Sequence, residues 1–193
     1  MPLYTQLSSV KSRLNITDTT DDTILTNMIK HCSTRFDHET RRNLDRAANT
    51  TEEFTADSTE LRLGRTPIES VASFHLKTNE AEGWVLQSDV DYLIHRNSII
   101  SLSWPLGSSH EILRVTYTGG YVLPGTTPGA GQTALPDDLE QSCIEQVAFW
   151  YQHRNRLGLV TVPAEGRTFF SLAPLDLLAH VKSTLQKYER YLN

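Results

Sequence analysis

The side chains best suited to metal chemistry are seven histidines, and they are scattered along the chain. His31 and His38 lie roughly two helical turns apart, which is too far for both to bind one metal ion without a third ligand between them. Asp37 and Glu39 are close in sequence, but no HExxH pattern or paired-carboxylate spacing accompanies them. We therefore expect exposed polar side chains rather than a metal site. The other histidines are His75, His95, His110, His153 and His180.

Two cysteines and a Ser-His pair are the candidates for nucleophilic catalysis. Cys32 and Cys143 fall on the apolar stripes of two expected helices, where a thiol is a small buried hydrophobe without the access and low pKa of a catalytic cysteine. No Gly-x-Ser-x-Gly elbow is present, and we expect the adjacent Ser109 and His110 in a turn. We expect no catalytic residues. A small hydrolase stays an alternative because a triad can be assembled from any chain order.

A glycine-rich segment raises the question of phosphate binding. The segment 125–131 contains three glycines and one proline. A Walker loop places a lysine and a hydroxyl directly after its last glycine, whereas here Gln132 follows Gly131. We interpret the segment as a surface loop and expect neither a nucleotide nor any other cofactor.

Composition limits the class of protein. The 193 residues, 38% of them hydrophobic, suffice for one domain, or one domain with an appended arm, around a real core. The net charge of −5 argues against a protein whose main work is to grip DNA phosphates. No apolar run approaches the roughly 20 residues that cross a bilayer, and the first residues lack the basic and apolar regions of a signal peptide. We expect no membrane partner, and a protein made and kept in the cytosol or in something assembled there.

Apolar residues at three- and four-residue spacing predict helices over 3–14, 22–44 and 136–156. Pro136 fits the first turn of the third helix because its missing N–H costs nothing there, and the two aspartates after it suit the positive end of the helix dipole. We expect these helices to bury an apolar core. Its expected members are Ile24, Leu25, Met28 and Phe36 on the second helix, and Leu139, Cys143, Val147 and Tyr151 on the third.

Between the second and third helices the period of the apolar residues changes to two, which predicts a β-rich region over 54–117. The polar run 45–53 is expected to break the second helix. A turn is expected near Arg96, Asn97 and Ser98, between two strands.

The order of these elements predicts an α+β fold. We expect mainly a helical bundle with a central β-rich insertion, forming a core over 1–156 that includes a loop over 122–135. We expect the remaining residues, 157–193, to form an extended arm and a C-terminal helix opened by Pro174.

The most informative segment begins at Tyr117 and ends at Arg154. Tyr-Thr-Gly-Gly-Tyr at 117–121, then a variable loop, then Leu-Pro-Asp-Asp-Leu at 135–139 before a long helix resemble the head–tail connector proteins of tailed bacteriophages. These are also called adaptor or head-completion proteins. The resemblance extends to the opening helices and to the first strands. The matching segments there are Leu14-Asn15-Ile16, the acidic cluster 18–22, the helix 24–41, Leu61-Arg62-Leu63, Pro67-Ile68 and Val71.

The resemblance implies a structural virion protein at the neck, assembled in the host cytoplasm, and not an enzyme. Such a protein forms a homo-oligomeric ring, twelve-fold by analogy with the family, that joins the portal protein to a tail-side neck or tail-completion protein. Genomic DNA passes through the lumen without sequence-specific binding. The alternative is a tail-side neck or tail-completion protein of the same virion.

Two segments are the expected docking sites. The final helix carries a narrow apolar seam that could pack on the chain's own core or on a neighbour. We favour docking, because the C-terminal segment of the family inserts into the portal. The expected portal-docking residues are Leu177, Leu178, Val181, Leu185, Tyr188 and Leu192, and the loop residues Gly125, Pro128 and Gly131 are expected to face the channel or the next ring.

Overall fold

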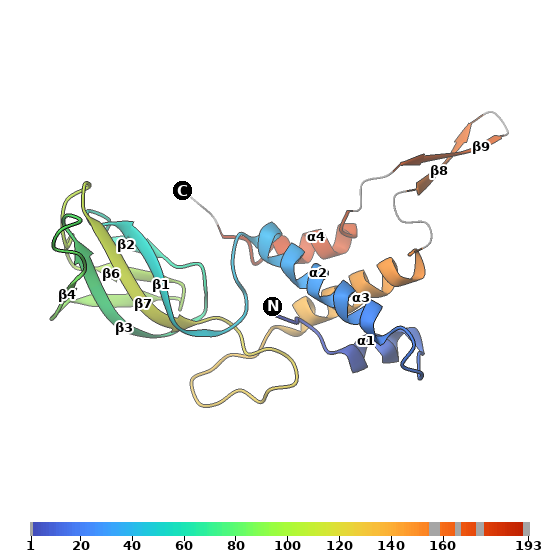
Figure 1. Cartoon of the computed structure of the whole chain (residues 1–193), viewed down its shortest axis with the longest axis horizontal. Helices are drawn as coiled ribbons and strands as arrows, with labels where there is room; N and C mark the ends of the chain where they lie inside the picture. Colours follow the sequence, from blue (N-terminus) through green and yellow to red (C-terminus); the bar gives the residue numbers. More distant parts are fainter. Residues whose placement is uncertain (1, 155–158, 165–166, 173–175, 191–193) are drawn as a thin grey trace. The chain divides into compact units, whose positions relative to one another are not determined.

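The computed structural model describes residues 2–154, 159–164, 167–172 and 176–190, and it divides the chain into two compact units (Figure 1). The helical unit comprises Met1–Thr40 and Pro136–Asn193, and the β unit comprises Arg41–Leu135. Helix and strand thus share the chain, which confirms a mixed fold but not a molecule that is mainly a helical bundle. In this division the last helix belongs with the first three.

The described part of the helical unit contains four helices. They are α1 (Leu7–Leu14), α2 (Asp22–Thr40), α3 (Asp137–Gln152) and α4 (Ala179–Gln186). α3 packs against the other three (Figure 1). α2 ends earlier than predicted, since Arg41 has a left-handed backbone with φ of 54° that no helix can continue.

The helical core contains most of the residues that the apolar spacing selected. Leu25, Phe36, Leu139, Cys143 and Val147 are fully buried. The expectation that Ile24 belongs to the core is wrong, because this side chain lies on the solvent-facing side of α2 and is 42% exposed. Met28 and Tyr151 are half-buried. The buried residues of α2 are Leu25, Ile29, Cys32, Ser33, Phe36 and Thr40.

Two antiparallel sheets form the β unit. One has the order β1-β7-β3-β4 and the other β2-β6-β5. They share one apolar cluster, to which Leu61 and Ile100 contribute from the smaller sheet and Leu113, Val115 and Tyr117 from the larger. The strands are β1 (Ala47–Thr55), β2 (Glu60–Arg62), β3 (Ile68–Lys77), β4 (Val85–Gln87), β5 (Tyr92–His95), β6 (Ile99–Leu102) and β7 (Ile112–Gly119).

Strand β1 was not predicted, because the run 45–53 is polar. It lies at the edge of the larger sheet and pairs only with β7, so a strand here needs few apolar side chains. The predicted turn after β5 is present, with φ of 51° at Arg96 and 52° at Asn97, which joins β5 to β6 as a tight hairpin.

A buried tyrosine ties β7 to the loop after β2. The hydroxyl of Tyr117 donates a hydrogen bond to Glu52 and accepts one from the Arg65 amide at 3.0 Å. The two oxygens of Glu52 accept from the Gly64 amide at 2.8 and 3.0 Å. Burial, together with the hydrogen bond to Glu52, raises the pKa of Tyr117 above its ordinary value. The neutral phenol is therefore the form that the folded β unit favours.

The Gly119-Gly120 pair at the end of β7 allows three backbone segments to meet. A Cβ on Gly119 would lie 2.6 Å from the Arg65 carbonyl oxygen, and one on Gly120 would collide with the Asp45 carbonyl. Gly120 also has φ of 101°, which L-residues rarely adopt. Hydrogen bonds hold the segments together: the Gly120 amide donates to Pro67 at 2.9 Å, and Tyr121 donates to Leu44 at 2.8 Å.

The predicted extended arm contains a hairpin. β8 (Leu159–Ala164) pairs antiparallel with β9 (Arg167–Leu172), and these two strands form a sheet of their own. Pro174, expected to open the last helix, lies outside the described residues, and α4 begins at Ala179.

The first prediction concerns the glycine junction. Replacing Gly120 with alanine should destabilise the β unit by about 2–4 kcal/mol, because the new Cβ meets backbone that cannot move aside. Gly131→Ala is the matched control: φ there is 78° but no atom lies within 4 Å of the added Cβ, so about 1 kcal/mol is expected. Urea denaturation of both variants measures the difference, and equal losses would contradict it.

The second prediction concerns Tyr117. Because its pKa is raised in the folded state, its contribution is complete below the unfolded pKa near 10. It decreases above that value and is lost as the pH rises through the raised pKa of the folded state. Tyr117→Phe should cost about 1–2 kcal/mol at neutral pH, and the stability of the variant should fall less steeply between pH 9 and about pH 11. Denaturant midpoints across that range provide the measurement, and parallel curves would contradict the assignment.

Candidate docking surfaces

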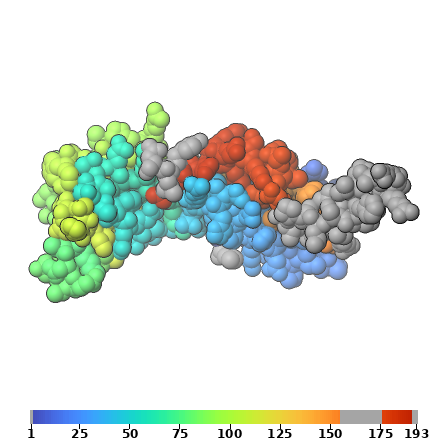
Figure 2. Space-filling view, turned by 90° about the horizontal axis from the view of Figure 1, so that it is seen from above, coloured from blue at the N-terminus to red at the C-terminus, as the bar shows by residue number. Residues whose placement is uncertain are grey.

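The apolar seam of α4 faces the helical unit's own core. Leu177, Val181 and Leu185 are buried, and α4 packs against α2 and α3. Figure 2 shows α4 (red) lying against α2 (blue). Leu178 and Tyr188 are half-buried, and Leu192 lies outside the described residues. The three buried residues cannot contact a partner while α4 is packed in this way.

Polar contacts reinforce the packing of α4. The backbone amide of Leu178 donates to the side-chain oxygen of Gln146 at 2.8 Å, and Gln146 is fully buried in α3. His180 Nε2 lies 2.7 Å from Glu145, and the Tyr188 hydroxyl donates to Asp138 at 2.7 Å. Both ends of α4 are therefore fixed to α3.

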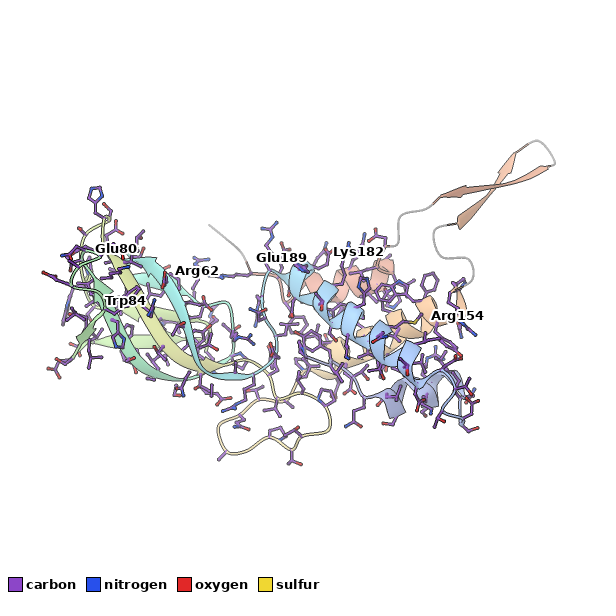
Figure 3. The ribbon with its side chains drawn as sticks, viewed as in Figure 1. Arg62, Glu80, Trp84, Arg154, Lys182 and Glu189 are labelled. Atoms are coloured by element: carbon purple, nitrogen blue, oxygen red, sulfur yellow. The ribbon has the colours of Figure 1, made fainter. Side chains whose placement is uncertain are left out.

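Charges beside α4 favour the ionised carboxylates. The hydrogen bond from Gln141 and then the His180 imidazole hold the pKa of Glu145 below its ordinary value. Lys182, labelled on α4 in Figure 3, does the same for the pKa of Asp176. A carboxylate whose pKa is lowered on folding stabilises the folded state at pH values above its ordinary pKa. This contribution is lost as the pH falls through the lowered pKa.

The surface that α4 offers to solvent is its polar face. Ala179, His180, Ser183, Gln186 and Lys187 are exposed, and two of them are basic or can become so. A partner that docks on packed α4 must therefore bind polar and cationic groups. The sequence pattern had predicted docking through the apolar seam, which lies on the opposite side of the helix.

Backbone hydrogen bonds join the two ends of the loop after Tyr121, and most of the residues between them are exposed. The Val122 amide donates to Thr133 at 2.8 Å, and the Leu135 amide donates to Val122 at 2.9 Å. All of the predicted loop residues, Gly125, Pro128 and Gly131, are exposed. Figure 1 draws the segment as a wide loop without helix or strand. The loop thus presents backbone and small side chains to solvent from a fixed base.

Sequence reasoning missed an apolar edge on the β unit. Val85 and Leu86 of β4 and Tyr92 and Leu93 of β5 are exposed, and each of these strands ends its sheet. The signal in the sequence was a pair of short apolar runs separated by acidic residues. Their solvent exposure depends on which strands pair, and one sequence does not show that.

An aromatic–cation group lies next to this edge on the larger sheet. The guanidinium of Arg114 lies 3.6 Å from the centre of the Trp84 ring, and it also pairs with Glu53 at 2.7 Å. Trp84, labelled in Figure 3, directly precedes β4. This stacking fixes the segment that leads into the apolar edge.

Of the residues considered for catalysis or metal binding, the fold brings only the two cysteines together, and it buries both. Cys32 and Cys143 are buried beside one another between α2 and α3, and burial raises the pKa of the Cys32 thiol. Ser109 and His110 lie in an exposed turn. Within the described ranges, no three His, Cys, Asp or Glu side chains are grouped so that they could hold a metal ion. In the same ranges, no helix has the length and apolar character to span a bilayer.

Comparisons with known proteins give a family match and several similar solved chains, one of which is described here. A sequence model of the head completion protein family matches residues 4–191. A chain from the solved neck of an empty GTA particle, computed with C6 symmetry, has 15% sequence identity and a TM-score of 0.55. The match covers 96% of this chain and 90% of that chain, and at this identity it shows a shared fold. No curated protein matches the sequence.

The third prediction tests the packing of α4. Leu185→Ala should lower the free energy of unfolding by about 2–4 kcal/mol, because it removes a side chain buried against α2 and α3. Leu178→Ala, at a half-buried position on the same segment, should cost less than half as much. Thermal denaturation of the two variants compares them. If Leu185→Ala leaves the stability unchanged, α4 does not belong to the core in solution.

Proposed function

The chain belongs to the head completion protein family, and from this membership we propose that it is a structural protein of a phage virion neck, forming a ring that joins the portal vertex to the tail. The observation that carries the proposal is the family match over nearly the whole chain. That match confirms the resemblance first noted at 117–154. The proposed role is mechanical, with no reaction catalysed.

A ring follows from repeated use of one head-to-tail interface that closes on itself. Each subunit that docks raises the effective concentration for the next contact, so a modest affinity per subunit gives a stable joint. We propose twelve subunits by analogy with the family. A twelve-fold ring also has six-fold symmetry, and the similar GTA neck was computed with C6 symmetry.

The two units offer different surfaces for the two neighbours. We propose that the C-terminal segment docks on the portal through the exposed polar face of α4 and the residues after it. The glycine-rich loop 123–134, with Gly125, Pro128 and Gly131 at exposed positions, faces the channel or the next ring. The net charge of −5 fits a lumen that lets DNA slide without binding it.

The fourth prediction tests the portal face. Ala179→Glu with Ser183→Glu places two carboxylates at exposed positions of α4, one turn apart. The first acid suits the helix N-terminus, so the fold should be kept. We expect the variant to lose co-sedimentation with portal rings purified from the same virus. Its affinity should fall by at least about tenfold, because two added carboxylates would lose their hydration at each subunit contact.

The control has the same spacing on a different helix. Ser8→Glu with Ser12→Glu alters two exposed positions of α1 and should leave portal binding intact. Particle imaging of the wild-type mixture gives the arrangement: a second ring stacked on the portal supports the proposal. Attachment to purified tails alone would move the protein to the tail side, and attachment to neither would overturn the structural role.

A further inference from the structure

Strands β4 and β5 leave unpaired apolar edges on the two sheets of the β unit. Each ends its sheet, so one side of each strand pairs with no other described strand. Leu86 and Leu93 are 60% and 67% exposed, and Val85 and Tyr92 are 47% and 36% exposed. We call these four residues the β4–β5 edge.

The other two sheet edges are protected, which sets the β4–β5 edge apart. β1 carries Glu52 and Glu53, and β2 carries Glu60 and Arg62. Charged side chains are a usual means by which proteins prevent an edge strand from pairing with another chain. An edge with exposed leucines and a tyrosine lacks that protection and is suited to receive a strand.

The chain also contains a strand pair that lacks a sheet to join. β8 and β9 pair only with one another among the described strands, and a two-stranded hairpin alone is marginally stable in water. Its sequence is rich in strand-forming apolar residues, with Val162 opposite Phe169 and Leu159 opposite Leu172 in the register. Each strand has six residues, enough to cover the four-residue β5.

The charges of the two segments are complementary. Residues 77–95, which contain the β4–β5 edge, carry four acids against one lysine, a net charge of −3. Residues 154–172, which contain the hairpin, carry three arginines against one glutamate, a net charge of +2. The acids Glu80, Glu82, Asp89 and Asp91 are all exposed. Opposite charges around an apolar centre favour association of these two segments over association of either with itself.

We propose that the β8–β9 hairpin of one copy adds to the β5 edge of a second copy and extends its sheet β2-β6-β5. Backbone hydrogen bonds along β5 supply affinity, and the exposed leucines gain apolar cover. The contact joins different surfaces on the two copies, so it repeats around a ring. The inference rests on the proposed ring and names its subunit contact.

Complementation between two variants tests the proposal. Leu86→Lys with Leu93→Lys disables the edge but keeps the hairpin. Val162→Asp with Phe169→Asp puts like charges at directly opposite register positions, which disfavours the hairpin but keeps the edge. Sedimentation velocity on the full chain, with one variant fluorescently labelled, should show concentration-dependent association of the wild type. Each variant alone should be monomeric, and an equimolar mixture should form a heterodimer that grows no further.

Several results would overturn the contact. They are a wild type that stays monomeric up to its solubility limit, an edge variant that still associates, or a mixture that stays monomeric. Ile24→Lys, at an exposed apolar position of α2, is the control and should associate like the wild type. If rings still stack on portals when complementation fails, the result supports the proposed ring and contradicts the hairpin contact. If no ring forms on portals while complementation succeeds, the result supports the hairpin contact and contradicts the proposed role at the neck.

Discussion

The β unit depends on the close approach of three backbone segments at Gly119 and Gly120. Carbonyl oxygens of Asp45 and Arg65 occupy the space that a Cβ would need. Across the same point the Arg46 amide donates to the Tyr121 carbonyl, and the Tyr121 amide donates to the Leu44 carbonyl. The segment that enters the unit and the segment that leaves β7 are therefore fixed side by side. An insertion whose ends lie together can interrupt a chain between two helices without separating those helices.

The sequence predicts the positions of the helices better than it predicts what each helix packs against. The spacing of Leu139, Cys143 and Val147 predicted a helix with a buried face, and the face is buried. The same kind of spacing on α4 could not decide between the protein's own core and a partner's groove, because both bury an apolar stripe. The decision came from contacts that lie far apart in sequence, such as the Leu178 amide with Gln146.

The strands show where local patterning ends. β7 alternates and is buried on one face, so its sequence is informative. β1 is polar because it lies at an edge beside water, and its pairing with β7 is set by partners about 60 residues away. The apolar edge of β4 and β5 escaped prediction for the opposite reason: apolar residues suggest burial, and only the sheet order shows that these strands have no outer neighbour.

The helical and β units differ in how completely each satisfies its own surfaces. In the helical unit, α4 packs on α2 and α3, and the buried residues of its apolar seam contact the chain's own core. In the β unit, β4 and β5 each leave an apolar edge of a sheet unpaired. The β8–β9 hairpin, which belongs to the helical unit, pairs with no other described strand. If the subunit joins a ring as proposed, the contacts that hold it together need not break on assembly. The proposed assembly contact uses strand edges that the fold leaves unpaired among the described strands.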